Sequence, residues 1–289
     1  MASFTSTHRT LLGPSAEVAD ISPASLPLPL GHILLAAAMI GLGIRGLIVG
    51  DFASVWQRIP IEHLPARSFF VYASAVIELA TGLGLLMKRT VAPSSAVLLV
   101  FLVLWAVLLK LPAVLFVPQM EATWLGFGEI AVIVAGGWVV FASHAGAWSG
   151  HHLRFATGAR GVRWARLLFV FALPMIGLSH FVYAKITVGF IPTWISAPYV
   201  WAYFTGGASI AASLAVLFGI VPKLASTLEA VMLSAITMLV WLPGAVTAPG
   251  NDSITPFLMS AAIACGAWAL ADSYRNVTSV RQPSKAMSE

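Results

Sequence analysis

Apolar stretches of about 19 to 23 residues recur along this chain and are separated by short polar segments. At 1.5 Å per residue, each stretch is long enough to cross the roughly 30 Å hydrocarbon core of a bilayer as an α-helix. None of them alternates as the strands of a membrane barrel do, so an all-α fold is expected. The pattern predicts eight membrane-spanning helices, over residues 32–50, 69–87, 94–117, 123–142, 164–185, 200–220, 226–247 and 254–272.

The composition agrees with a membrane protein. Apolar residues make up 59% of the 289 positions and charged residues only 9%, whereas a soluble domain carries roughly 25% charged residues. This excludes a soluble cytosolic enzyme and a nucleic-acid-binding module, so the net charge of +5 indicates no nucleic acid partner. The expected partner is the lipid bilayer. The single cysteine, Cys265, leaves no intrachain disulfide and no CxxC relay.

The basic residues outside the spans predict the orientation of the chain. Three of them, Arg58, Arg67 and Lys185, fall on one side of the membrane. The other side has eleven, which are Arg9, Lys88, Arg89, Arg154, Arg160, Arg163, Arg166, Lys223, Arg275, Arg281 and Lys285. Positive charge marks cytoplasmic loops, so both termini are expected in the cytoplasm, and no cleaved signal is expected at the amino terminus. Four tryptophans fall at predicted outer boundaries, where interfacial anchoring explains them: Trp56, Trp124, Trp194 and Trp201.

The two halves of the chain resemble each other at an offset of about 131 residues. Tyr72 aligns with Tyr203, and Leu111-Pro112 aligns with Leu242-Pro243. Each unit has four spans, an even number, so both copies enter the membrane from the same face and parallel repeats are expected. The predicted organisation is a cytoplasmic tail (1–31), a first repeat (32–142), a basic cytoplasmic linker (143–163), a second repeat (164–272) and a cytoplasmic tail (273–289).

Both repeats resemble the DoxX-like family of small four-helix membrane proteins. In the first repeat the resemblance rests on Ile44-Arg45-Gly46 and on residues 76–86 (VIELATGLGLL), and in the second on GLSHF at 177–181, FIPTWI at 190–195 and YFTG at 203–206. The second repeat departs from the family by having Ser209 where a glutamate is usual. The family includes a subunit of a thiosulfate:quinone oxidoreductase, so the resemblance implies a bacterial inner-membrane location and a link to quinones, but the fold alone does not define the activity.

Four charged residues fall inside the first repeat, one on each predicted span: Arg45, Glu78, Lys110 and Glu129. Counting 1.5 Å per residue, they lie about 8 to 14 Å below the outer surface. We expect them to converge on a polar pocket in the outer half of this repeat, because intramembrane charges mark functional sites. The alternative is two buried ion pairs that fix helix register. The aligned positions of the second repeat are uncharged, which favours the functional interpretation: Phe181, Ser209, Trp241 and Met259 or Ser260.

Residue chemistry suggests roles for this pocket. Arg45 would bind a carboxylate or oxyanion as a planar fork, Lys110 would act as a compact charge, and Glu78, the deepest of the four, would carry a proton. A quinone head group or a small anion fits such a site. His180 is expected to bond a backbone carbonyl or Lys185, with contact to a ligand as the alternative, and we include it among the candidate ligand-binding residues.

The remaining ionisable residues suggest no metal site or haem. His32 and His180 lie roughly 24 Å apart across the membrane, too far to be two axial ligands of one haem. The linker histidines His144, His151 and His152 lack nearby cysteines and acids, so no metal site is expected there. Glu229 is expected to be a boundary charge at the inner end of the seventh span.

Three functions remain open from the sequence. The first is a quinone-linked or redox-accessory subunit that needs a redox partner subunit holding the electron-carrying centre. The second is a carrier or permeation path for a small anion or organic acid, with Arg45 and Lys110 as its contacts. The third is a membrane scaffold without a ligand. No catalytic residue is assigned, and whether the chain is an enzyme stays open.

Overall fold

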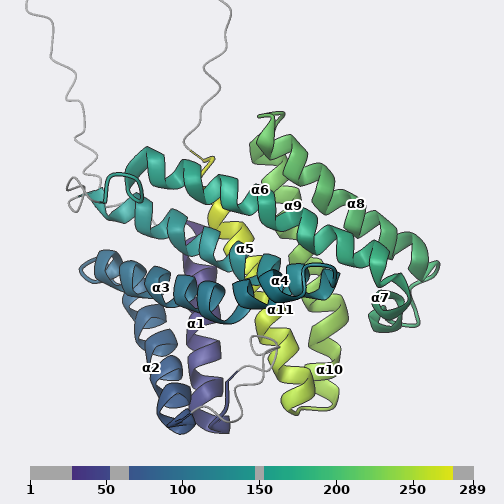
Figure 1. The fold of residues 1–289 in the computed structure, drawn as a ribbon, viewed down its shortest axis with the longest axis horizontal. Coiled ribbons are helices and arrows are strands. Elements are labelled where there is room, and N and C mark those ends of the chain that lie inside the picture. Colours follow the sequence, from purple (N-terminus) through teal and green to yellow (C-terminus); the bar gives the residue numbers. More distant parts are fainter. Residues whose placement is uncertain (1–27, 53–64, 147–152, 276–289) are drawn as a thin grey trace, which may run out of the picture.

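The computed structural model describes residues 28–52, 65–146 and 153–275, and every regular element in these ranges is a helix (Figure 1). Eight helical spans in these ranges are long and apolar enough to cross a membrane, so this is a multi-pass membrane protein. They are Leu30–Val49 (α1), Arg67–Leu85 (α2), Val91–Phe116 (α3, η3 and α4), Glu121–His144 (α5), Gly158–Val182 (α6), Pro198–Leu217 (α8), Pro222–Thr247 (α9, η5 and α10) and Asn251–Asp272 (α11). Each predicted span is confirmed, with ends that differ by six residues at most.

The largest difference lies at the start of α6. This helix begins at Gly158, inside the predicted linker, so Arg160 and Arg163 are helical. It ends at Val182, and a short helix that the sequence did not predict, α7 (Ala184–Phe190), follows. The Tyr183 hydroxyl between them accepts a hydrogen bond from the backbone N–H of Ala122, at 3.2 Å, and ties this break to the start of α5.

Two of the spans contain a π-helical segment. The third consists of α3 (Val91–Trp105), η3 (Ala106–Lys110) and α4 (Leu111–Phe116), and the seventh of α9 (Pro222–Ile236), η5 (Thr237–Trp241) and α10 (Leu242–Thr247). In both, the wider turn ends directly before a Leu-Pro pair. Proline has no N–H and its ring clashes with the carbonyl four residues earlier, so the backbone bonds rearrange in the turn before it.

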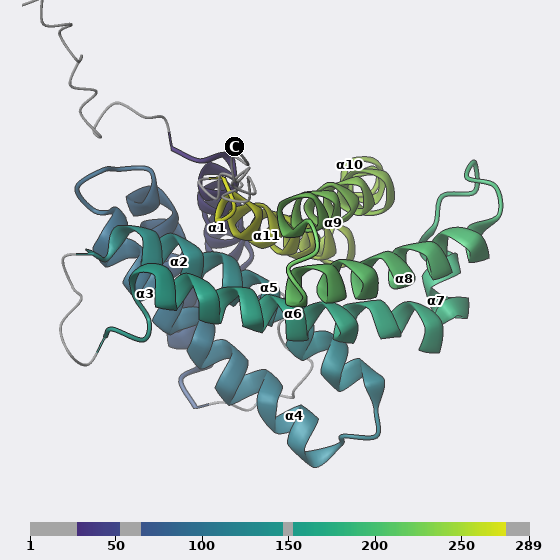
Figure 2. The same ribbon diagram turned by 90° about the horizontal axis from the view of Figure 1, so that it is seen from above.

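Helices α5 and α11 form the centre of the molecule. They are the most buried of the eight spans, and Figure 2 shows them between α2 and α3 on one side and α7 and α8 on the other. The two helices cross at Gly136 and Gly266, where a Cβ on Gly136 would lie 2.6 Å from the Cα of Gly266. Only glycines permit this approach, which lets the core close around two central helices.

Contacts between helix ends place four helix termini at one end of the molecule. The Gly31 N–H donates to Asp272 at 2.6 Å, and His32 Nε2 donates to the Leu85 carbonyl at 2.8 Å. Arg166 donates to the carbonyl of Ser273 at 2.6 Å. The starts of α1 and α6 therefore lie at the same end of the molecule as the ends of α2 and α11.

The outside of the bundle is apolar, which is consistent with contact to lipid chains. Large exposed side chains occur on most spans, for example Phe69, Val100, Phe171, Phe204 and Leu228. Of the tryptophans expected at the outer boundary, Trp194 and Trp201 are exposed, Trp124 donates its indole N–H to the Pro118 carbonyl, and Trp56 lies outside the described residues.

Candidate functional site

Two cavities of very different size lie among the described helices and bear on function. The small cavity, of about 50 Å³, lies between α1, α2, the end of α3 and the start of α11. The large cavity, of about 600 Å³, lies between α5, α6, α7, α8, α9, η5 and α11. The first is built mainly from the amino-terminal half and the second mainly from the carboxy-terminal half. Each is closed by a central helix from the opposite half, which is α11 for the small cavity and α5 for the large one.

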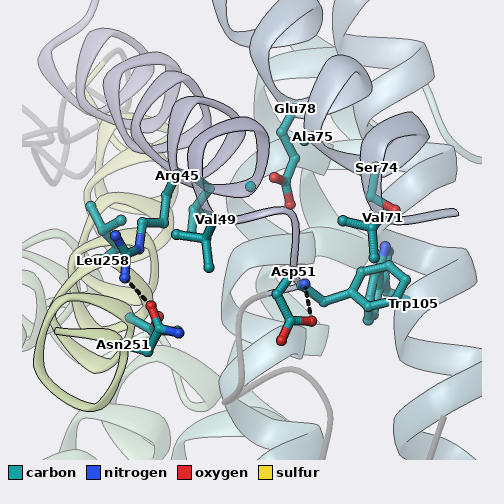
Figure 3. Close-up of a pocket in the computed structure, with 14 residues that line it drawn as sticks. Arg45, Val49, Asp51, Val71, Ser74, Ala75, Glu78, Trp105, Asn251 and Leu258 are labelled. Atoms are coloured by element: carbon teal, nitrogen blue, oxygen red, sulfur yellow. Dashed lines mark hydrogen bonds between the residues drawn. The ribbon is translucent and has the colours of Figure 1, made fainter. Parts of the chain in front are cut away.

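Close contact between α1 and α2 shapes the small cavity. A Cβ on Gly46 would lie 2.8 Å from that of Ala75, so the two helices approach closely at this point. Ser74 and Glu78, one turn apart on α2, both line the cavity. Figure 3 shows the Glu78 carboxyl group turned into the cavity, while Arg45 points toward α11 and donates a hydrogen bond to the Asn251 side chain. At the mouth, Asp51 accepts hydrogen bonds from the Arg67 guanidinium at 2.5 Å and the Phe52 N–H at 2.7 Å.

The structure divides the four intramembrane charges between cavities. Arg45 and Glu78 line the small cavity, whereas Glu129 lines the large one. Lys110 is buried at the end of η3 and lines neither, with its Nζ 3.7 Å from the position a Cβ on Gly126 would occupy. The single pocket expected from the sequence is corrected to two sites, because the face of α5 that carries Glu129 is part of the wall around the second half's cavity.

Apolar and aromatic side chains form most of the large cavity. Phe190 of α7 and Trp241 of η5 pack with ring centroids 5.2 Å apart and join two walls. Gly177 lies against the backbone of Gly206 and holds α6 close to α8 on another side. The shape therefore depends on the unpredicted helix α7 and on the π-helical turn.

The ionisable side chains that line the large cavity are Glu129, His180 and Asp252. His180 Nδ1 lies 3.1 Å from the Ile176 carbonyl, so the predicted backbone partner is confirmed. A carbonyl only accepts, which assigns the proton to Nδ1 and leaves Nε2 as an acceptor in the neutral ring. The described lining residues include neither lysine nor arginine.

A second buried carboxyl group was not expected from the sequence. Glu229 is only 2% exposed and accepts a hydrogen bond from the Ser209 hydroxyl at 2.8 Å. The predicted boundary position is wrong because α9 begins at Pro222, which places Glu229 two turns inside the helix. The signal was Val221-Pro222, since proline favours the first turn of a helix.

Two histidines, at the start of α1 and at the end of α5, form one ring contact. His32 is buried, and its ring packs edge-on against that of His144 with centroids 5.1 Å apart. Within the described ranges there is no group of three or more histidine, cysteine, aspartate or glutamate residues that could hold a metal ion. His151 and His152 lie outside those ranges.

Comparison with known proteins finds no family model, no curated protein and no solved structure that matches this chain.

Proposed function

We propose that this protein binds a membrane-dissolved small molecule with a quinone-type head group in the large cavity, as a quinone-linked or redox-accessory subunit. The observation that carries the proposal is a cavity of about 600 Å³ with aromatic walls and a few polar groups. Binding sites for small molecules typically measure roughly 300 to 1,000 Å³ and have this mixture of surfaces. The small cavity, of about 50 Å³, has space for a few water molecules and not for a ring.

The polar groups of the large cavity favour a head group that donates hydrogen bonds. Carboxylate oxygens of Glu129 and Asp252 accept, and so does Nε2 of neutral His180. The two hydroxyls of a hydroquinone match such acceptors, whereas an anion meets two acids and no basic lining residue except the histidine. This supports a quinone-linked function over an anion carrier at this site.

The walls of the large cavity also favour a ligand that arrives from the bilayer. Phe204 on α8 and Leu239 on η5 both line the cavity and are 59% and 43% exposed on the apolar outside of the bundle. A molecule dissolved among lipid chains would meet these side chains before it reached Glu129 and His180. An isoprenoid or alkyl tail could remain between α8 and η5 while the head group lies inside.

The architecture proposed with this function is a pair of parallel DoxX-like repeats. The two π-helical segments, Ala106–Lys110 and Thr237–Trp241, lie 131 residues apart, the same offset that relates the sequences. The packing partners also correspond, since α1 packs on α2 and α6 packs on α8. These features support a duplicated unit. The two halves contain different cavities, which fits an activity confined to one half.

The membrane and partner belong to the same proposal. We place the protein in a bacterial inner membrane with both termini in the cytoplasm, because the end that holds Gly31 and Asp272 also carries Arg166 and Arg275. A separate redox subunit would supply the electron-carrying centre, since the chain has one cysteine and its described residues contain no group of three or more histidine, cysteine, aspartate or glutamate side chains that could hold a metal ion.

Calorimetry on the purified protein in lipid nanodiscs tests the proposal. Decylhydroquinone should bind, and decanoate, an anion with an alkyl chain of similar length, should not. Glu129→Leu should weaken hydroquinone binding by about 10- to 100-fold, because a hydrogen bond to a charged group contributes about 1.5 to 3 kcal/mol.

Glu229→Gln is the matched control, since this carboxyl group is also buried but does not line the large cavity. Its affinity should equal that of the unchanged protein. Tight binding of decanoate, or equal hydroquinone binding by Glu129→Leu and the control, would contradict the proposed function.

A further inference from the structure

We propose that the small cavity is a second site, which binds a single small cation, a proton or a monovalent metal ion, at Glu78. This site lies in the other half of the molecule from the large cavity and does not depend on the ligand proposed there. Its geometry rests on one buried carboxyl group that faces open space.

Glu78 has no partner of its own within the described residues. Its side chain is 8% exposed and makes no hydrogen bond or ion pair with them. The carboxyl group points into the cavity instead (Figure 3). A buried ionised carboxylate without a partner is strongly unfavourable, so it either holds a proton or has a cation beside it.

Within the described residues, no charged side chain that lines the cavity bonds Glu78. From α1, the Arg45 guanidinium donates to Asn251 of α11 and its Nε has no hydrogen-bond partner, and after α1, Asp51 bonds Arg67. The residues that α3 and α11 contribute to the cavity are uncharged. The cavity contents must therefore satisfy the Glu78 carboxyl group, and the Ser74 hydroxyl in the same lining offers a further oxygen ligand.

The second half solves the same problem differently. Ser209 occupies the position aligned with Glu78, and its hydroxyl satisfies the buried Glu229 at 2.8 Å. Neither residue lines the two cavities described above. In the first half Glu78 faces a cavity, whereas in the second half the buried carboxyl group is satisfied by a hydrogen bond from Ser209. This contrast assigns the small cavity to a cation.

Thiol reagents of opposite charge test the site in detergent-purified protein. The background is Cys265→Ser, which removes the natural thiol, and the reporter is Ser74→Cys, with Val49→Cys as a second reporter in the same cavity. The cationic reagent 2-aminoethyl methanethiosulfonate should react about tenfold faster than the anionic 2-sulfonatoethyl reagent, since the charge of Glu78 attracts one and repels the other. Adding Glu78→Gln should remove that preference.

Ser209→Cys is the matched control, at the aligned buried position, and should react with neither reagent. Slower cationic labelling when sodium replaces choline at constant ionic strength identifies a metal cation. A preference for the cationic over the anionic reagent that fades only as the pH falls identifies a proton, because the smaller thiolate fraction slows both reagents alike. The proposal is overturned if both reporters fail to react, if neither shows a cation preference, or if the preference survives Glu78→Gln.

Discussion

At the scale of single residues, two buried carboxyl groups have different surroundings: Glu78 lines a cavity, and Glu229 accepts a hydrogen bond from Ser209. Arg45, Glu78, Lys110 and Glu129 stand out in apolar runs, so their place inside the membrane could be predicted. Their partners could not, because the Arg45 partner Asn251 is 206 residues away in sequence. In the sequence, Ser209 is notable only because a glutamate is expected at its position. In the structure its hydroxyl donates a hydrogen bond to Glu229.

The bond between Ser209 and Glu229 makes a prediction at this scale. Ser209→Ala should lower the free energy of unfolding by about 1 to 3 kcal/mol, because it leaves a buried acceptor unsatisfied. Reversible unfolding in mixed micelles measures this. Thr205→Ala is the control, since its hydroxyl donates only to carbonyls of its own helix, those of Trp201 and Ala202. An equal loss in both variants would show that the bond to Glu229 has no special weight.

At the scale of elements, hydrophobic run length predicts the spans well and their interior poorly. An apolar run shows where a helix crosses the membrane, but the π-helical turns depend on how the backbone bonds rearrange before Pro112 and Pro243. The sequence shows the repeated Leu-Pro pair, but it does not show that a π-helical turn precedes each pair. The break at Tyr183 was hidden too, because α7 continues the apolar pattern of α6.

The crossing of α5 and α11 leads to the prediction at this scale. Gly136→Ala should destabilise the protein by about 1 to 3 kcal/mol or more, because the added methyl group meets the backbone of Gly266, which cannot rotate away. Thermal unfolding in detergent measures the effect. Gly207→Ala is the control, since a Cβ there meets no atom within 4 Å, and its change should stay within about 0.5 kcal/mol. A Gly136→Ala protein as stable as this control would refute the close crossing.

At the scale of the whole molecule, the even number of spans and the shared end of α1 and α11 bring the described ends of the chain together. The hydrogen bond between Gly31 and Asp272 joins them directly. The number of apolar runs and the positions of the basic loops predict that both ends of the chain lie on the same side. The sequence could not predict the two cavities, because they form where helices from opposite halves meet, and no local pattern records that contact.

The orientation is the prediction at this scale. Fluorescent reporters that fold only in the cytoplasm should be active when fused before residue 1 or after residue 289. Alkaline phosphatase, which is active only outside, should work when inserted near Gln119, between α4 and α5. The reverse pattern would mean that the basic end of the molecule faces outward, against the expected charge rule.

The central claim is that the large cavity holds a neutral ligand drawn from the membrane. Native mass spectrometry of the gently solubilised protein tests it directly, with Thr205→Trp, which fills the cavity from α8, as the comparison. The unchanged protein should retain a molecule with the mass of a quinone or hydroquinone, and Thr205→Trp should lose it. Retention of an organic anion, an empty protein, or the same occupancy in both proteins would contradict the account.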